Sequence, residues 1–331
     1  MVNLILISIL INFLLILYYR RINFFSVYSN EKGKKISLIG GNILIINIIL
    51  YYIFNISFNN LPLSEFFIER RQLYSFLISS IGIYFMGAFD DKYNLRPIAK
   101  IFVMIFFISF SILGDSKLLI DKLRFLDFEI ELRNYNLIFT VFCFLAFINA
   151  INMFDGINLQ VVFYSIFLLI FLILNSVFVQ LSIVLIIALV FFSILNYKNK
   201  SFLGNSGSHL LGFLLAYFLV KFYNLNNGFV YAEEILCLMF IPGLDMIRVS
   251  FKRIIMGKNP MLGDENHLHH RIKKKLNSNF ALIINFLITI IPIIIYKIYN
   301  LNLFYVIFLG IIIYYLIFFI FKFNIIFEEK K

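Results

Sequence analysis

Two adjacent carboxylates, Asp90 and Asp91, stand where one of the most apolar stretches of the chain ends. Holding paired carboxylates at a membrane boundary costs free energy unless a cation or a substrate binds them. Ionisable residues in such a place indicate function by default, although a solvated loop pair is the alternative interpretation. Chemistry is therefore expected first at residues 86–97.

A second polar group occupies residues 149–158, where Asn149, Asn152, Asp155 and Asn158 follow one another at intervals of three. On a helix this spacing forms a single polar ridge, at least until Gly156 breaks or ends it. Carboxamide and carboxylate oxygens suit Mg²⁺, sugar hydroxyls or phosphate. A hydrogen-bonded seam between membrane helices is the alternative.

Residues 202–208 form a glycine-containing turn before the next apolar span. Free backbone N–H groups at a helix N-terminus bind anions readily. Simple capping of that helix explains Ser206 and Ser208 nearly as well.

Residues 264–271 gather three imidazoles, two carboxylates and one guanidinium. Zinc is one interpretation, but the spacing matches no usual structural zinc pattern and no cysteine joins the group. With Arg248, Lys252 and Arg253 just upstream, contact with an anionic nucleotide or phosphate is favoured.

The composition of the chain predicts an all-α polytopic membrane protein forming one domain over residues 1–331. Of these 331 residues 62% are hydrophobic, and apolar runs recur at the length of about 20 residues that a bilayer-spanning helix needs. We predict eleven spans and keep the first as a helix rather than a cleaved signal. The spans are 3–19, 36–54, 73–89, 99–114, 137–153, 160–176, 179–196, 207–223, 229–245, 280–297 and 301–322.

The distribution of Lys and Arg predicts an outside N-terminus, because positively charged loops stay on the cytoplasmic side. This orientation puts most of the 29 basic residues, and all four polar groups, on the inside. The net charge of +11 then reflects topology and an anion-facing surface rather than a nucleic-acid partner. Outside, the alternating residues 125–132 predict a small β-hairpin. Cys143 and Cys237 fall within apolar spans and are not expected to form a disulfide.

Together these motifs resemble the polyprenyl-phosphate N-acetylhexosamine-1-phosphate transferases, or glycosyltransferase family 4. The matching motifs run in the right order over about two thirds of the chain, and their combination is specific. The His-Leu-His-His form resembles the branch that initiates surface polysaccharides rather than the muramyl-pentapeptide branch. The motifs are Asp90-Asp91 with Leu95 and Lys100, residues 149–158, Phe202-Leu203-Gly204 with Gly207-Ser208, Asp264 with residues 267–271, and more weakly Gly40-Gly41.

The resemblance implies that undecaprenyl phosphate attacks the β-phosphorus of a UDP-activated N-acetylhexosamine such as UDP-GlcNAc and releases UMP. It implies Mg²⁺, or Mn²⁺ in its place, in an inner-membrane enzyme with cytoplasmic active-site loops, and leaves open a homodimer. The implied pathway is synthesis of O-antigen, lipopolysaccharide or another envelope polysaccharide. The implied catalytic residues are Asp90, Asp91 and Asp155, and the implied metal ligands are these three with Asn205. The implied substrate-binding residues are Lys100, Asn149, Asn152, Asn158, Arg253, His267, His269, His270 and Arg271.

One residue departs from the family pattern: Asn205 stands where an aspartate is usual. An amide oxygen still coordinates a cation but brings no charge, so metal affinity is the property in question. A membrane transporter, or a catalytically impaired relative, is the rival hypothesis, because buried Asn and Asp also mark ion pathways. A transporter predicts polar residues at the bilayer midplane and symmetry between halves, and the sequence shows neither.

Overall fold

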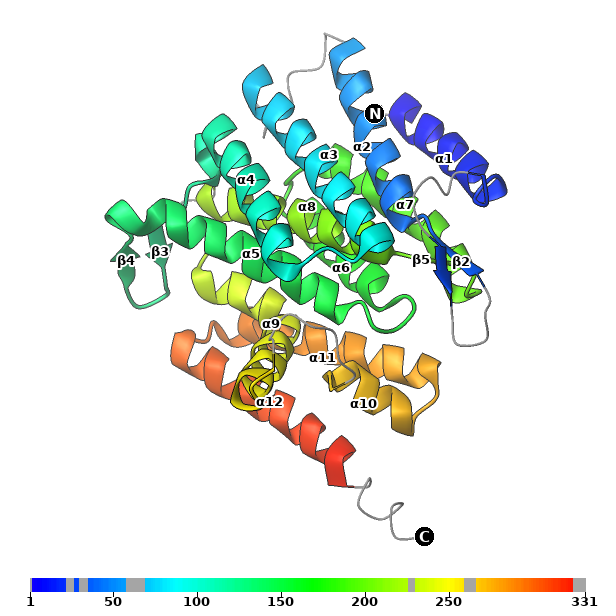
Figure 1. The fold of residues 1–331 in the computed structure, drawn as a ribbon. Helices are drawn as coiled ribbons and strands as arrows, with labels where there is room; N and C mark the ends of the chain where they lie inside the picture. The colour runs from blue at the N-terminus through cyan, green and yellow to red at the C-terminus, as the bar shows by residue number, and fades with distance from the viewer. Residues whose placement is uncertain are drawn as a thin grey trace, which may run out of the picture.

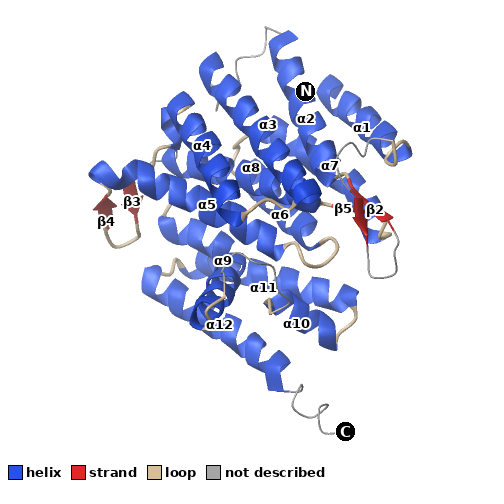
Figure 2. Cartoon of the chain, viewed as in Figure 1, coloured by secondary structure: helices blue, strands red, loops and turns tan. Residues whose placement is uncertain are grey.

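The computed structural model describes residues 2–21, 27–29, 35–57, 69–225, 230–258 and 266–323, and it is built almost entirely of helices (Figures 1 and 2). The helices of the described part are α1 (Val2–Leu17), α2 (Gly40–Ser57), α3 (Arg70–Tyr93), α4 (Pro97–Gly114), α5 (Asn136–Phe154), α6 (Gln160–Leu174), α7 (Val179–Tyr197), α8 (Gly204–Leu225), α9 (Ala232–Ile255), α10 (Leu268–Lys275), α11 (Ser278–Tyr299) and α12 (Leu303–Phe323). The all-α fold class is confirmed.

Each of the eleven predicted spans corresponds to one long helix. Eight helices of the described part are long and apolar enough to cross a membrane. Helices α1 and α6 are apolar but have only 16 and 15 residues, and α9 carries several charged residues. The twelfth helix, α10, was not predicted, because its eight residues are polar and basic and follow no membrane-span pattern. The chain is a multi-pass membrane protein.

Two small sheets lie at opposite ends of the helical bundle (Figure 2). In one, β1 (Val27–Ser29) pairs antiparallel with β2 (Lys35–Leu38), which pairs in parallel with β5 (Ser201–Phe202). In the other, β3 (Lys122–Arg124) pairs antiparallel with β4 (Glu129–Glu131). This second sheet confirms the predicted hairpin, with its turn at residues 125–128. The three-stranded sheet was not predicted, since strands of this length are too short to show an alternation of apolar and polar residues.

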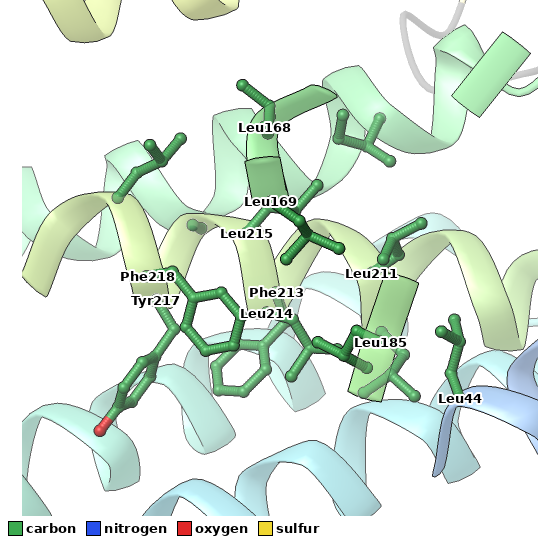
Figure 3. Packing of buried hydrophobic residues seen from close by; sticks show 14 of the residues in the cluster. Leu44, Leu168, Leu169, Leu185, Leu211, Phe213, Leu214, Leu215, Tyr217 and Phe218 are labelled. Atoms are coloured by element: carbon green, nitrogen blue, oxygen red, sulfur yellow. The ribbon is translucent and has the colours of Figure 1, made fainter. Parts of the chain in front are cut away.

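Helix α8 is the centre of the bundle and packs against α2, α3, α5 and α6. Figure 3 shows its side chains Phe213, Leu214 and Phe218 among leucines from neighbouring helices, and all three are buried. Lipid tails are as apolar as leucine, so helices in a membrane associate through close packing and hydrogen bonds rather than through the hydrophobic effect. Gly87 and Gly212 permit that closeness: a Cβ at Gly87 would lie 2.5 Å from the Cα of Ser206. This contact brings the end of α3 onto the start of α8.

The other end of the bundle is held by a buried ion pair. Lys221 on α8 and Asp115 after α4 are both about 1% exposed or less, and their Nζ and Oδ2 atoms lie 2.5 Å apart. Tyr217 also donates to Asp115. Removing one partner of such a pair would leave an uncompensated buried charge. The pair therefore holds the end of α8 against the residue that follows α4.

Candidate active site

Asp91 is held at the N-terminus of α8. Its Oδ1 accepts a hydrogen bond from the backbone N–H of Asn205 at 2.7 Å, and its Oδ2 accepts one from Ser206 at 3.0 Å. A carboxylate at a helix N-terminus is favoured because it accepts from unpaired N–H groups and faces the positive end of the dipole. Asp91 therefore performs the capping that was considered for the serines of this turn.

Gly204 is required where α8 begins. Its φ of +74° lies in the left-handed region, and a Cβ there would come within 2.8 Å of Asp91 Oδ2. The turn thus admits the carboxylate only because residue 204 lacks a side chain. Asn205, the next residue, lines a cleft beside Asp91.

Asp90 faces away from this cleft although it is the neighbour of Asp91. It is 1% exposed, its Oδ1 accepts from the Leu95 N–H at 2.9 Å, and its Oδ2 lies 2.6 Å from Lys100 Nζ. Asp90 is not among the residues that line the cleft. The structure therefore pairs Asp90 with Lys100. The catalytic and metal-binding roles of Asp90 and the substrate-binding role of Lys100 stay predictions.

The polar ridge predicted for residues 149–158 is only half helical, because α5 ends at Phe154. Asn152 faces α8, where its Oδ1 accepts from Ser208 Oγ at 2.6 Å. Asn149 donates to the carbonyl of Leu145 in its own helix, and Asn158, beyond the helix, donates to Asn199 Oδ1 at 2.7 Å. Part of the ridge is thus a hydrogen-bonded seam, while Asn152, Asp155 and Asn158 line the cleft.

Asp155 caps the C-terminal end of α5 and points into the cleft. Burial raises the pKa of Asp155 to about 7, and the negative charge of nearby Asp91 adds to this rise. Two carboxylates that repel each other in one cleft are an arrangement that a divalent cation stabilises.

Helix α10 carries the histidines and is anchored by Asp245 of α9. Asp245 is 3% exposed, and its carboxylate accepts from His267 Nδ1 at 2.7 Å and from the Leu268 N–H at 3.1 Å. It also accepts from Arg248 at 2.8 Å and from Tyr314 of α12 at 2.6 Å. One buried carboxylate therefore joins three helices and fixes the position of α10.

His269 packs against the turn that follows α5. It is 1% exposed, neither ring nitrogen has a hydrogen-bond partner in the described residues, and a Cβ on Gly156 would lie 2.0 Å from its Nε2. Burial, and secondarily the His270 imidazole, lowers the pKa of His269 well below its usual range. His269 is therefore neutral at physiological pH and has one donor and one acceptor, but it is buried and not among the described residues that line the cleft.

The remaining predicted residues of this segment divide between the cleft and its support. His270 lines the cleft, whereas His267 is buried against Asp245. The Arg271 guanidinium lies 4.6 Å from the ring centre of Phe318, and Arg253 is 4% exposed. Neither arginine lines the cleft, so their substrate-binding roles stay predictions. Asp264, which also matched the pattern, lies outside the described residues.

These segments enclose a single cleft of about 1030 Å³ at the end of the bundle that carries the β1–β2–β5 sheet. The ends of α3 and α5, the start of α8 and helix α10 all contribute, which is the convergence that the sequence predicted. Its polar lining consists of Asp91, Asn152, Asp155, Asn158, Asn196, Asn199, Asn205, Ser208, His270, Lys273, Ser278 and Asn279.

The oxygen donors of the cleft are of the kind that suits Mg²⁺. Among the described residues, no group of three or more His, Cys, Asp and Glu could hold a metal ion. Mg²⁺ is usually bound through one or two carboxylates, water and substrate phosphates. Asp91, Asp155 and the amide oxygen of Asn205 are a donor set of that kind.

Sequence reasoning missed several residues of the site. Asp245 lay inside a predicted span without a second polar residue at a regular interval, and only the fold brings His267 to it. Lys273 was counted as a topology charge, yet it lines the cleft. Asn196 was passed over although it organises the loop after α5, accepting from the Leu159 N–H at 2.7 Å.

Comparison with known proteins finds a matching family and several similar proteins. The family model described as glycosyl transferase family 4 matches residues 73–223, which include Asp91, Asp155 and Asn205. Three relatives, from Salmonella typhi, Escherichia coli K12 and Haemophilus influenzae, are named undecaprenyl-phosphate alpha-N-acetylglucosaminyl 1-phosphate transferase. They are 26%, 25% and 26% identical over 64%, 63% and 73% of this chain. The match spans 60% of the first two relatives and 69% of the third, and no transporter is among the three.

Proposed function

We propose that the chain belongs to glycosyl transferase family 4 and that it transfers an N-acetylhexosamine 1-phosphate from a UDP-sugar to undecaprenyl phosphate. The observation that carries the proposal is the cleft itself: Asp91, Asp155 and Asn205 face one space with His270 and Lys273. We propose N-acetylglucosamine 1-phosphate as the group transferred, by analogy with the names of the relatives.

In the proposed reaction an oxygen of the lipid phosphate forms a bond to the β-phosphorus of the UDP-sugar. The bond from that phosphorus to the oxygen of the α-phosphate breaks, so UMP leaves and the sugar remains joined to the lipid through a pyrophosphate. A phosphate monoester has a second pKa near about 6, so it is largely dianionic at neutral pH and needs no dedicated base. The main barrier is the repulsion between two anions.

The residues of the chain reduce this repulsion in two ways. Lys273, which lines the cleft, supplies positive potential beside the phosphates, whereas Lys100 is paired with Asp90 outside the cleft lining. His270 supplies hydrogen bonds for orienting the sugar nucleotide on the α10 side of the cleft, and buried His269 packs against His270. Helix α10 keeps its position through Asp245, so this carboxylate acts as a positioning residue.

Mg²⁺ is the proposed cofactor, with Mn²⁺ as a substitute. Asp91, Asp155 and Asn205 would hold it, and when bound it neutralises pyrophosphate charge. Asp91 keeps free lone pairs for this after accepting two backbone N–H groups, because a carboxylate offers about four acceptor positions. The pairing of Asp90 with Lys100 suggests that Asp90 positions Lys100 rather than binding the ion.

We propose that the cleft lies on the cytoplasmic side of the inner membrane, where UDP-sugars are made. Lys and Arg are concentrated in the loops at the end of the bundle that carries the cleft, and such loops stay on the cytoplasmic side. The product would then initiate a lipid-linked envelope polysaccharide such as O-antigen.

The proposal is tested with purified protein, undecaprenyl phosphate, Mg²⁺ and a panel of UDP-sugars, with UMP as the readout. UMP should form with a UDP-N-acetylhexosamine and only when the lipid phosphate is present. Asp155→Asn serves as the control for contaminating activity. Absence of UMP with every donor, from protein that is folded and monodisperse, would contradict the proposed function.

A further inference from the structure

A buried imidazole on α8 takes no part in the proposed reaction. His209 is 2% exposed and is not among the described residues that line the cleft. Its Nδ1 atom lies 2.7 Å from the backbone carbonyl oxygen of Asn205, about one helical turn earlier. Because a carbonyl oxygen only accepts, Nδ1 carries the hydrogen and donates it to Asn205. A histidine buried in this way acts on the site through another residue rather than on a substrate.

The Asn205 carbonyl oxygen lies in a confined space between α3 and α8. A Cβ on Gly87 of α3 would lie 2.6 Å from this oxygen. Ser208 Oγ lies 3.5 Å from it, but the one hydrogen of this hydroxyl goes to Asn152 Oδ1 at 2.6 Å. Among the described residues, His209 is therefore the side chain that holds this carbonyl.

Asn205 is thereby fixed through both of its peptide groups. Its N–H donates to Asp91 Oδ1 at 2.7 Å, and its carbonyl accepts from His209. A residue has two soft backbone dihedrals, one on each side of its Cα atom, and each of the two hydrogen bonds restrains one of them. The direction of the Asn205 side chain, which lines the cleft, follows from that backbone.

This restraint matters because Asn205 is an uncharged candidate ligand. The charge of a carboxylate attracts a divalent cation from a distance, whereas an amide offers a dipole that helps only when its oxygen points at the ion. A ligand that is held in the binding direction before the ion arrives also loses less conformational entropy on binding. Orientation by His209 therefore compensates in part for the charge that Asn205 lacks.

We propose that His209 is a positioning residue that orients the Asn205 amide oxygen toward the proposed Mg²⁺. The inference rests on the proposed function, because it takes over the proposed metal site. It adds a residue that touches neither substrate nor metal. Removal of the His209 donor should weaken metal binding only while residue 205 has an amide to orient.

Metal binding without substrates tests the proposal, with Mn²⁺ followed by electron paramagnetic resonance at pH 8. Two variants remove the donor: His209→Leu keeps roughly the bulk of the ring, and His209→Ala leaves a cavity, so either one that folds is sufficient. Each should raise the dissociation constant for Mn²⁺ about 5-fold, the equivalent of about one net hydrogen bond. In an Asn205→Ala background the same substitution should change this constant less than about twofold, because no amide is left to orient.

A rescue variant and a matched control separate this role from general stability. His209→Asn keeps an N–H donor near the position of Nδ1, since Asn47 and Asn149 donate to the carbonyl four residues earlier at 2.8 and 2.7 Å. Ser80→Ala on α3 removes a similar hydrogen bond, 2.7 Å from Ser80 Oγ to the Phe76 carbonyl, at an equally buried position. Both variants should bind Mn²⁺ within about twofold of the wild type.

Several results would overturn the proposal while UMP release by the wild type upheld the proposed function. They are unchanged Mn²⁺ affinity after removal of the His209 donor, an equal loss in the Asn205→Ala background, an equal loss in Ser80→Ala, or an equal loss in His209→Asn. Wild-type protein that releases UMP but binds no Mn²⁺ would overturn it as well. Absence of both Mn²⁺ binding and UMP release in folded wild-type protein would remove the proposed function too.

Discussion

The carboxyl of Asp155 exchanges its proton near neutral pH, so cation binding by the cleft should depend on pH in that range. Burial and the nearby Asp91 raise the pKa of Asp155 to about 7, far above the usual range of an aspartate. Below this pKa the carboxyl is mainly protonated and neutral, and a proton must leave before the carboxylate can bind a cation. Metal affinity should therefore increase as the pH rises through 7.

The size of the effect follows from competition between proton and metal. For a pKa of about 7, the apparent dissociation constant exceeds its high-pH limit by a factor of 1 + 10^(pKa − pH). This factor is about 11 at pH 6 and about 1.1 at pH 8, so affinity should change about 10-fold. An aspartate at its ordinary pKa of about 3.9 would give a change of under ~1% over the same range.

The assay is metal binding without substrates, because the lipid phosphate itself titrates near pH 6. Mn²⁺ binding is followed by electron paramagnetic resonance at pH 6, 7 and 8, with Mg²⁺ as competitor. Asp155→Asn, which cannot take up the proton, serves as the matched variant. A wild-type affinity that is constant from pH 6 to 8, or a tenfold slope that persists in Asp155→Asn, would refute the reasoning.

Four further predictions follow from the same geometry. Asp91→Asn should lower turnover at least ~10²-fold, because it removes a charged element facing the phosphates; turnover near the wild type, at matched protein amounts, would exclude Asp91 from the site. Asn205→Asp should lower the Mg²⁺ concentration for half-maximal activity about 10-fold, because it adds a charged ligand, whereas Asn205→Ala should raise it; identical titrations would remove Asn205 from metal binding. Gly156→Ala should lower turnover about 10²-fold by pushing His269 and α10 aside, while Gly243→Ala, with nothing within 4 Å of its Cβ, should not; equal turnover of the two would contradict this. Asp245→Asn should raise the KM for the UDP-sugar about 10-fold with little change for the lipid, because it loosens α10; equal changes for both substrates would indicate general unfolding.

The membrane architecture was predictable because it depends on composition over long segments. Every expected span is a helix, and the alternation of residues 125–132 gave the hairpin. Hydropathy is averaged over about twenty residues, so single exchanges hardly affect it. Helix α10 escaped the same reasoning because it is short and its stability comes from tertiary contacts such as His267 with Asp245.

The convergence of the site was also predictable, whereas the orientation of single side chains was not. The distribution of Lys and Arg predicted that the polar segments lie on one side of the membrane. The structure joins them through contacts such as Asp91 with Ser206 and Asn152 with Ser208. Sequence could not distinguish Asp90 from Asp91, since neighbouring residues on a helix point about 100° apart and only packing decides which one faces the cleft. Likewise, Ser206 and Ser208 were considered as caps until the fold supplied Asp91 for that purpose.

The most direct measurement of the central claim is the fate of the β-phosphorus of the donor. UDP-GlcNAc carrying ³²P at the β-position is incubated with the protein, undecaprenyl phosphate and Mg²⁺, and the label is followed into lipid and water-soluble products. Transfer of a sugar 1-phosphate predicts label in the lipid fraction, in equal amount to unlabelled UMP. Label recovered in UDP would mean transfer of the sugar alone, and label recovered in water-soluble N-acetylglucosamine 1-phosphate would mean hydrolysis of the pyrophosphate; either result would contradict the account.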